Sequence, residues 1–379
     1  MEFIAVAVYV AILFAIAFFS MKKTKTLNAF FLGDRKIGPW VSAFAYGTTY
    51  FSAVMFIGYA GKIGWGFGLS ALWVVIGNAF LGSYLAWKIL ARPTREMTAR
   101  LGTMTLPGFL EKRYQSKGLK VVSALIIFIF LVPYSASVYM GLSYFFEMVF
   151  GIEYIYALAF MAVITAIYLV MGGYFAVTLT DFVQGLIMIF GVFVLIFCVV
   201  NSPQVGGFGN VIPALSSVDP QLVAPVGPPG AVALFSLVIL TSLGPWGLPQ
   251  MLQKFYSIRN ENVIRTATLV TTGFALLMAF GAYFTGSLSR LFFSSLAEVG
   301  NNLDRIMPTI ISQTVPDVVA VLLLLLIMAA SMSTLDSLVL VSSSSIAVDL
   351  LQTVRPQTDQ KTSVLVMRIL CIIFIGFSL

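Results

Sequence analysis

The sequence predicts an all-α membrane protein that crosses the bilayer many times. Hydrophobic residues make up 59% of the 379 residues and charged residues only 10%, and the mean hydropathy is +0.98. Apolar runs long enough to span a bilayer recur along the whole chain, a pattern that soluble globular domains do not have. Two of these runs contain glycine and proline in their middles, which predicts broken helices at membrane depth.

The apolar runs predict a series of spans, of which only the last is incomplete. They cover residues 2–20, 39–61, 68–90, 120–149, 153–170, 176–200, 231–250, 264–289, 316–341 and 363–379. The first is expected to be a helix and not a signal peptide, because its basic residues follow it and no small-residue cleavage motif is present.

The placement of lysine and arginine predicts the orientation. All but three of the 22 basic residues fall on one side of the predicted topology, and the exceptions are Lys62, Arg290 and Arg305. The side that carries most of the basic residues includes Lys254 after the seventh span and Arg355 after the ninth. By the positive-inside rule this side is cytoplasmic, so the N-terminus is expected outside a cell (plasma) membrane. The net charge of +7 then reflects topology and not nucleic-acid binding.

The ninth span carries an unusual set of polar residues. Ala330, Ser333, Thr334 and Ser337 fall within an arc of roughly 100° on a helix, and Asp336 lies about 60° beyond its edge. Hydroxyl oxygens suit a hard cation. The alternative is that these hydroxyls only bond the carbonyl four residues earlier or tighten helix contacts.

The second and seventh spans are the interrupted ones. Residues 46–52 of the second span combine glycine with β-branched and aromatic residues, and residues 244–249 of the seventh contain two prolines and two glycines. Broken helices expose carbonyls and amides that need a cavity or a ligand. Breaks at matching positions of two five-helix halves indicate the site of a secondary transporter, although a pair of simple proline kinks is the alternative.

Several classes of function are disfavoured. The chain has no histidine, and its two cysteines, Cys198 and Cys371, lie in apolar runs without motif spacing. No nucleophile–base pair or metal-ligand cluster is visible, so we expect no enzyme activity, no cofactor and no metal other than sodium. A cation channel is also disfavoured, because no repeated filter motif is present.

Several motifs together resemble the sodium/solute symporter family, which includes the sodium/proline and sodium/pantothenate symporters. The strongest are residues 172–184, Gly-Gly-Tyr-Phe-Ala-Val-Thr-Leu-Thr-Asp-Phe-Val-Gln, and residues 332–337, Met-Ser-Thr-Leu-Asp-Ser. Residues 33–35, 38–40, 106–114 and 247–250 match further signatures in the expected order. The resemblance covers essentially the whole chain.

The resemblance implies an inverted five-helix-repeat fold like that of the leucine transporter, with one extra N-terminal helix. The single transporter domain, 1–379, would comprise the extra helix and its cytoplasmic loop (1–37), a first repeat (38–200), an extracellular linker (201–230) and a second repeat (231–379). Because the family usually has about thirteen spans, the second repeat is expected to be incomplete and the chain truncated at its C-terminus. As given, it is not expected to transport.

The resemblance implies a sodium site with five ligands, assigned to the residues of this chain that match the family's motif positions. They are the main-chain carbonyls of Thr48 and Phe51, the carbonyl of Ala330, and the hydroxyls of Ser333 and Thr334. Asp181 matches an aspartate linked to sodium coupling, and a carboxylate at membrane depth is a functional candidate on energetic grounds too. The alternative is an acid that stabilises a helix N-terminus. Asp336 is expected either to serve sodium coupling, on the exit path, or to bond a neighbouring helix.

The solute is expected between the two breaks. Its predicted lining is Tyr46, Thr49, Tyr50 and Ser52 on one side and Thr241, Ser242, Trp246 and Gln250 on the other. This lining contains no charged side chain, which disfavours cationic solutes, whereas half-helix amides can accept a carboxylate. The resemblance places an aromatic pair where this chain has Thr241 and Pro245, which argues against proline itself.

The sequence therefore predicts a symporter that imports a small organic solute with sodium by alternating access. The solute would be a zwitterion, a monocarboxylate or a neutral polar molecule, and the expected partners are the sodium ion, this solute and the lipid bilayer. The alternative is a symporter-like sensor module of a signalling protein, which a signalling domain after Leu379 would reveal.

Overall fold

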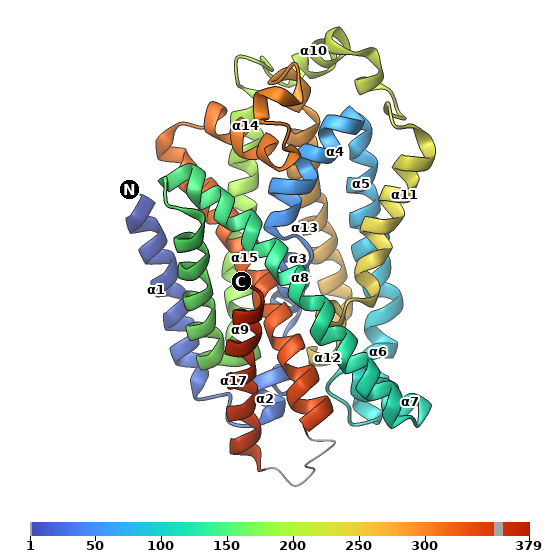
Figure 1. Cartoon of the computed structure of the whole chain (residues 1–379). Coiled ribbons are helices and arrows are strands. Elements are labelled where there is room, and N and C mark those ends of the chain that lie inside the picture. The colour runs from blue at the N-terminus through green and yellow to red at the C-terminus, as the bar shows by residue number, and fades with distance from the viewer. Residues whose placement is uncertain (1, 352–358) are drawn as a thin grey trace.

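The computed structural model describes residues 2–351 and 359–379, so Arg355 lies outside the described residues. Within that part the chain is almost entirely helical, and it holds 8 helices long and apolar enough to cross a membrane. The helices form one bundle, with α10 at one end and α2, α6 and α7 at the other (Figure 1). The prediction of an all-α, polytopic fold is confirmed.

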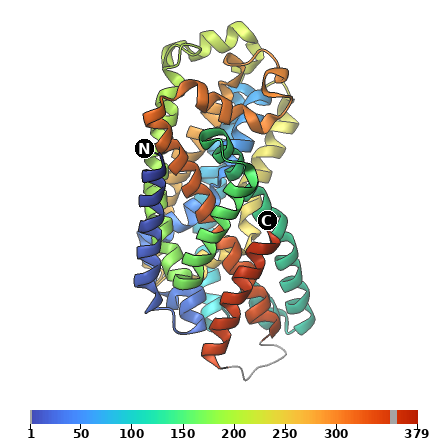
Figure 2. The same ribbon diagram turned by 60° about the vertical axis from the view of Figure 1, so that its left-hand side comes forward.

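The first half of the chain contains α1 (Glu2–Met21), α2 (Leu27–Leu32), α3 (Pro39–Tyr50), α4 (Ala60–Phe67), α5 (Leu72–Ile76), α6 (Arg92–Arg100), α7 (Leu106–Tyr114), α8 (Lys117–Phe150) and α9 (Tyr154–Val200). Helix α1 runs along the edge of the bundle against α9 (Figure 2). The π-helical segments η2 (Met55–Tyr59) and η4 (Gly77–Leu85) flank α4 and α5.

The second half contains α10 (Val211–Val218), α11 (Gly230–Leu243), α12 (Pro249–Ser257), α13 (Asn262–Ser287), α14 (Ile306–Thr314), α15 (Asp317–Ser344) and α17 (Gln360–Phe377). A π-helical segment, η12 (Ser345–Leu351), extends α15. Helix α10 lies in the predicted linker 201–230, which caps one end of the bundle (Figure 1).

Helix α9 is two antiparallel legs joined by a sharp turn. Its 47 residues would span about 70 Å if straight, more than twice the thickness of a bilayer core. Gly173 turns the chain with φ 55° and ψ −157°, and a Cβ there would lie 2.9 Å from the carbonyl oxygen of Phe30. This turn lies in the interval between the predicted fifth and sixth spans, 153–170 and 176–200, which are the two legs (Figure 1).

The second and third spans join in a similar turn. Gly68, with φ 56°, ends α4, and a Cβ there would lie 2.4 Å from the carbonyl oxygen of Leu222. The helical segments before and after Gly68, and those before and after Gly173, are counted as separate spans. With α3 included, every predicted span then has a helical counterpart. The division of the chain at residues 37, 200 and 230 stays a prediction.

Helix α15 lies at the centre of the bundle. In its apolar window 78% of the residues are buried, against 17% for α11 and 28% for α1, whose apolar faces lie on the outside. Polar side chains on α15 therefore face other parts of the protein. There, buried hydroxyls and carboxylates can find hydrogen-bond partners.

At the bundle end with α2 and α6, the contacts of Arg35 and Ile37 join segments that are distant in sequence, and we call this set of contacts the clasp. Ile37 and Ile258 form an isolated parallel bridge that joins the chain just before α3 to the chain just after α12. Arg35 donates hydrogen bonds to the carbonyl oxygens of Tyr256 (3.1 Å) and Thr103 (2.6 Å) and to the hydroxyl and carbonyl oxygens of Thr98. Burial, with a smaller contribution from nearby Arg95, lowers the pKa of Arg35 to about 10, so its guanidinium stays charged at neutral pH.

Candidate functional site

The break in the second span is shorter than the sequence predicts. Helix α3 continues through Tyr50, and only Phe51 and Ser52 leave the helical conformation before it resumes at Ala53. The expectation that Tyr46–Tyr50 are non-helical is wrong, because the segment is packed tightly: a Cβ on Gly47 would lie 2.6 Å from the ring of Phe274. The last carbonyls of a helix lack an intrahelical donor, so the break makes those of Thr48 and Thr49 available.

Two hydroxyls of α15 meet these carbonyls. Ser333 Oγ lies 3.2 Å from the carbonyl oxygen of Thr48, and Thr334 Oγ1 lies 3.4 Å from that of Thr49. Both hydroxyls are also 3.2 Å from the carbonyl oxygen of Ala330. The structure thus brings together Thr48, Ala330, Ser333 and Thr334, four of the predicted sodium ligands. Phe51, the fifth, forms the break itself and is buried. The carbonyl of Thr49 is an addition that the sequence did not indicate.

The spacing of these oxygens suits a hard monovalent cation. Two oxygens bound at right angles to one ion at roughly 2.4 Å, a distance typical of calcium–oxygen contacts, lie roughly 3.4 Å apart. The hydroxyls of Ser333 and Thr334 donate hydrogen bonds to these carbonyls at 3.2 and 3.4 Å, distances that are compatible with this value. All of the donors are oxygen, and Thr48, Ser333 and Thr334 are fully buried, so the residues fit a sodium ion.

Asp181 has a basic partner that sequence proximity does not show. It lies fully buried on the second leg of α9, and its Oδ2 is 3.2 Å from Nζ of Lys254 on α12. The sequence placed Lys254 among the cytoplasmic charges after the seventh span, but its side chain is only 1% exposed. Lys254 is therefore a buried residue of α12 and not an exposed loop charge, while its assignment to the cytoplasmic side stays a prediction.

Asp336 bonds a neighbouring helix. Tyr168, on the first leg of α9, donates a hydrogen bond to its Oδ1. Its Oδ2 has no hydrogen-bond partner among the described residues, and the side chain is fully buried. The neighbouring Tyr9 hydroxyl accepts from Gln184 and bonds the sulfur of Met332, one turn earlier on α15.

A chain of hydrogen bonds connects the break of α3 to the ion pair of Asp181 and Lys254. Thr49 Oγ1 lies 3.0 Å from Ser337 Oγ, which in turn accepts a hydrogen bond of 2.9 Å from Lys254. The break of α3, the polar face of α15, α12 and α9 therefore share one buried network around Ser337. Ser337 was placed on the ligand face by its spacing, and its partners here are Thr49 and Lys254.

The second break also occurs where the sequence predicts it. Residues Gly244–Gly247 form a short 3₁₀ segment, Leu248 is extended, and the helix resumes as α12. Between the two breaks lies a cavity of about 400 Å³. Its polar lining consists of Tyr50, Ser52, Tyr59, Asn78, Tyr134, Ser137, Thr241 and Tyr283, and its remaining lining is apolar or glycine.

Three of the eight predicted lining residues, Tyr50, Ser52 and Thr241, line this cavity. The other five lie near it and bond elsewhere or remain unpaired. Tyr46 donates to the carbonyl of Gly82, Trp246 to that of Leu81, Ser242 to Asn78 Oδ1, Thr49 pairs with Ser337, and Gln250 Oε1 has no partner among the described residues.

The sequence missed five polar lining residues. One of them, Tyr59, lies on η2 in the second span, and the other four come from three other spans. Asn78 lies on η4, Tyr134 and Ser137 on α8, and Tyr283 on α13. A polar residue in each of these apolar runs was the available signal. It was insufficient because it does not say which helix faces meet.

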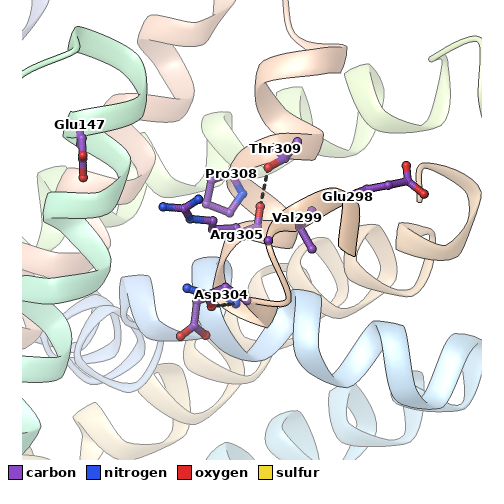
Figure 3. A pocket seen from close by; sticks show the side chains of 9 residues that line it. Glu147, Glu298, Val299, Asp304, Arg305, Pro308 and Thr309 are labelled. Carbon is purple, nitrogen blue, oxygen red and sulfur yellow. Dashed lines mark hydrogen bonds between the residues drawn. The ribbon is translucent and has the colours of Figure 1, made fainter. Parts of the chain in front are cut away.

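A second cavity, of about 340 Å³, lies towards the end of the bundle near α14 and differs in charge. Glu147 on α8 faces Arg305 and Asp304 across it, while Glu298 points away (Figure 3). Its charged residues Glu147, Asp304 and Arg305 are exposed, whereas Val299 and Pro308 in its lining are buried. Among the described residues no group of three or more Asp, Glu, Cys or His side chains could hold a metal ion.

Comparisons with known proteins agree with this architecture. The family model described as the sodium:solute symporter family matches residues 30–379. A sodium/proline symporter of Staphylococcus aureus (strain bovine RF122 / ET3-1) is 33% identical over 366 residues, which cover 95% of this chain and 70% of that protein. Another from Staphylococcus aureus is 33% identical, covering 97% of this chain and 72% of its own length.

The fold matches two solved transporters. A Na⁺-coupled sialic acid symporter in a substrate-bound, outward-open state has a TM-score of 0.84 at 17% identity, covering 100% of this chain and 80% of that chain. A nucleobase-cation-symport-1 family transporter in a closed conformation has a TM-score of 0.57 at 15% identity, covering 91% and 72%. This likeness confirms the predicted leucine-transporter-like fold. The chain is a transporter and not an enzyme, and it belongs to the sodium:solute symporter family.

Proposed function

We propose that this protein imports a small organic solute together with sodium by alternating access. Sodium binds between the break of α3 and the buried face of α15. Its ligands are the carbonyls of Thr48, Phe51 and Ala330 and the hydroxyls of Ser333 and Thr334. The observation that carries the proposal is the 3.2 Å approach of Ser333 Oγ to the carbonyl oxygen of Thr48 across two different spans.

The break of α3 couples the ion to the solute. Thr48 and Thr49 precede the break and present carbonyls to α15, whereas Phe51 and Ser52 line the 400 Å³ cavity. An ion that holds the end of α3 against α15 fixes the position of Phe51 and Ser52. Sodium then raises solute affinity, and the solute raises sodium affinity by the same factor. Asp181 belongs to the same network through Lys254, and Asp336 lies outside it, bonded to Tyr168. Both carboxyl groups are assigned to sodium coupling in this proposal.

The cavity supports a zwitterion, a monocarboxylate or a neutral polar molecule as solute. Its volume of about 400 Å³ is at the small end of ligand sites. Its lining offers hydroxyls, one amide and aromatic rings, and no charged side chain. A cationic solute would be buried without a counter-charge, which is costly. The 33% identity to sodium/proline symporters supports an amino-acid-like solute.

The transporter is expected in the cell membrane with its N-terminus outside. The basic residues support this orientation, since Lys22, Lys23 and Lys25 after α1 and Lys112 and Arg113 on α7 lie at the same end of the bundle (Figure 1).

The sodium site is tested by the sodium dependence of uptake into proteoliposomes, measured with a chain completed by the further spans that the family implies. Ser333→Ala and Thr334→Ala each remove a charge-assisted contact of about 1.5–3 kcal/mol. The sodium concentration for half-maximal uptake should therefore rise by roughly 10-fold or more. Ser343→Ala, a buried serine on the same helix, is the matched control. Equal sodium dependence in all three variants would contradict the assignment.

The solute class is tested by competition against one labelled substrate. Amino acids, monocarboxylates and neutral polar solutes should compete with it, whereas polyamines and dicarboxylates should not. Inhibition by cationic solutes alone would show that the uncharged cavity is not the binding site.

A further inference from the structure

Lys254 occupies a site that has the chemistry of a cation-binding site. Its ammonium is 3.2 Å from the Asp181 carboxylate and 2.9 Å from the Ser337 hydroxyl. The ring of Tyr174 covers it, with its centroid 5.3 Å away, and Tyr174 is held by a hydrogen bond to Ser257. A carboxylate, a hydroxyl and an aromatic face are all ligands that stabilise a monovalent cation.

This site is next to the proposed sodium site. Ser337, which accepts from Lys254, is one helical turn beyond Ser333 and Thr334 on the same face of α15. The hydroxyl of Thr49 bonds Ser337, while the carbonyl of Thr49 meets Thr334. The ammonium and a sodium ion would therefore bind to neighbouring oxygens on the same face of α15 and on Thr49. Each positive charge raises the electrostatic cost of placing another cation beside it.

The charges of the buried pair beside Ser337 already cancel. Asp181 and Lys254 form an ion pair whose side chains are at most 1% exposed. The proposed sodium ion next to this pair adds one positive charge to the buried region. A second sodium ion beside it would add another at membrane depth, which is strongly unfavourable.

We propose that Lys254 is an internal cation that occupies the oxygen site between Asp181 and Ser337 and limits this symporter to one bound sodium ion. The inference rests on the proposed sodium coupling and adds its stoichiometry. Removing the ammonium leaves the Asp181 carboxylate buried without a counter-ion. A second sodium ion then replaces the ammonium, with Asp181 and Ser337 as ligands.

The test is the number of ²²Na⁺ ions bound per purified full chain at saturation. The wild-type protein should bind about one, and Lys254→Met should bind about two, a twofold rise. Lys254→Arg keeps the positive charge and should bind about one. The double variant Asp181→Asn/Lys254→Met removes both charges and should also bind about one.

Lys254→Met could depend on sodium to fold, so thermal unfolding in sodium chloride and in choline chloride is measured alongside. Stabilisation by sodium that is larger in Lys254→Met than in the wild type supports the proposal. One ion bound by Lys254→Met, or its unfolding in both salts while the double variant stays folded, overturns it. Two ions bound by the wild type also overturn it. A wild-type chain that binds no sodium overturns the proposed function as well.

Discussion

The hydroxyl of Tyr50 donates a hydrogen bond of 2.7 Å to the carbonyl oxygen of Thr241. Tyr50 is the last residue of α3, and Thr241 lies just before the break that follows α11, so this bond joins the two interrupted helices beside the cavity. The two halves of the fold therefore meet through a side chain that also lines the proposed solute site.

Tyr50→Phe should weaken solute binding. The bond to Thr241 contributes about 0.5–1.5 kcal/mol, and the part of it that positions the cavity lining is lost from solute binding. The solute concentration for half-maximal uptake should therefore rise by at most roughly 10-fold. Tyr46→Phe is the control, because Tyr46 also donates to a backbone carbonyl, that of Gly82, but does not line the cavity. Equal shifts in both variants would mean that the bond acts on helix packing and not on the solute.

Asp181→Asn should destabilise the protein and reduce sodium-driven uptake. Its carboxylate is the charged partner of the buried Lys254, and breaking a buried ion pair costs about 3–5 kcal/mol. Chemical unfolding in detergent measures this loss. The double variant Asp181→Asn/Lys254→Met leaves no buried unpaired charge in this pair and should lose less. If single and double variants lose the same stability, the pair does not hold these helices together.

Tyr168→Phe should destabilise the protein through Asp336. The tyrosine is the described hydrogen-bond donor to this fully buried carboxylate, and a hydrogen bond to a charged group contributes about 1.5–3 kcal/mol. Tyr156→Phe, on the same leg of α9 with 65% exposure, is the control and should change little. Unfolding midpoints of the two variants that differ by less than the measurement error would contradict this role of Tyr168.

The start of α17 should loosen at acidic pH. Asp359 caps this helix, and hydrogen bonds from the hydroxyl and amide of Thr362 lower the pKa of its carboxyl. Because this pKa is lower in the folded than in the unfolded chain, the cap is fully present above the ordinary aspartate pKa of about 3.9 and is lost as the pH falls through the folded value.

Hydrogen exchange at the Thr362 amide, corrected for the intrinsic pH dependence of exchange, measures this effect. Protection should fall as the pH is lowered to about 3. Asp359→Asn keeps a capping side chain that does not titrate, so its protection should not change with pH. Equal pH dependence in both proteins would exclude the carboxylate as the cause.

The sequence could predict the spans, the two breaks and one face of α15 because each depends on local chemistry. Apolar run length sets a span, and glycine and proline at 244–249 set a break. Helical periodicity places Ser333 and Thr334 together. The extent of the first break was mistaken because helix propensity is a weak signal, and the packing of Gly47 against Phe274 keeps residues 46–50 helical.

The partners of the buried charges could not be predicted, because they depend on how helices distant in sequence pack. Lys254 and Asp181 are 73 residues apart, and a lysine after an apolar run is expected to be an exposed loop residue until the packing of α12 is known. The residues that line the cavity could not be predicted for the same reason. Asn78, Tyr134 and Tyr283 each lie in a different span, and only the packing of those spans brings them to one cavity.

The clasp formed by Arg35 and the bridge between Ile37 and Ile258 restricts how the interrupted helices can move. It fastens the start of α3 to the end of α12, so these two segments are anchored at one common point. A motion that keeps this anchor has to flex at the non-helical residues, Phe51, Ser52 and Leu248. A motion that separates α3 from α12 at that end has to break the Arg35 bond to Tyr256 first. Opening that end of the bundle therefore requires breaking both the bridge between Ile37 and Ile258 and the hydrogen bonds of Arg35.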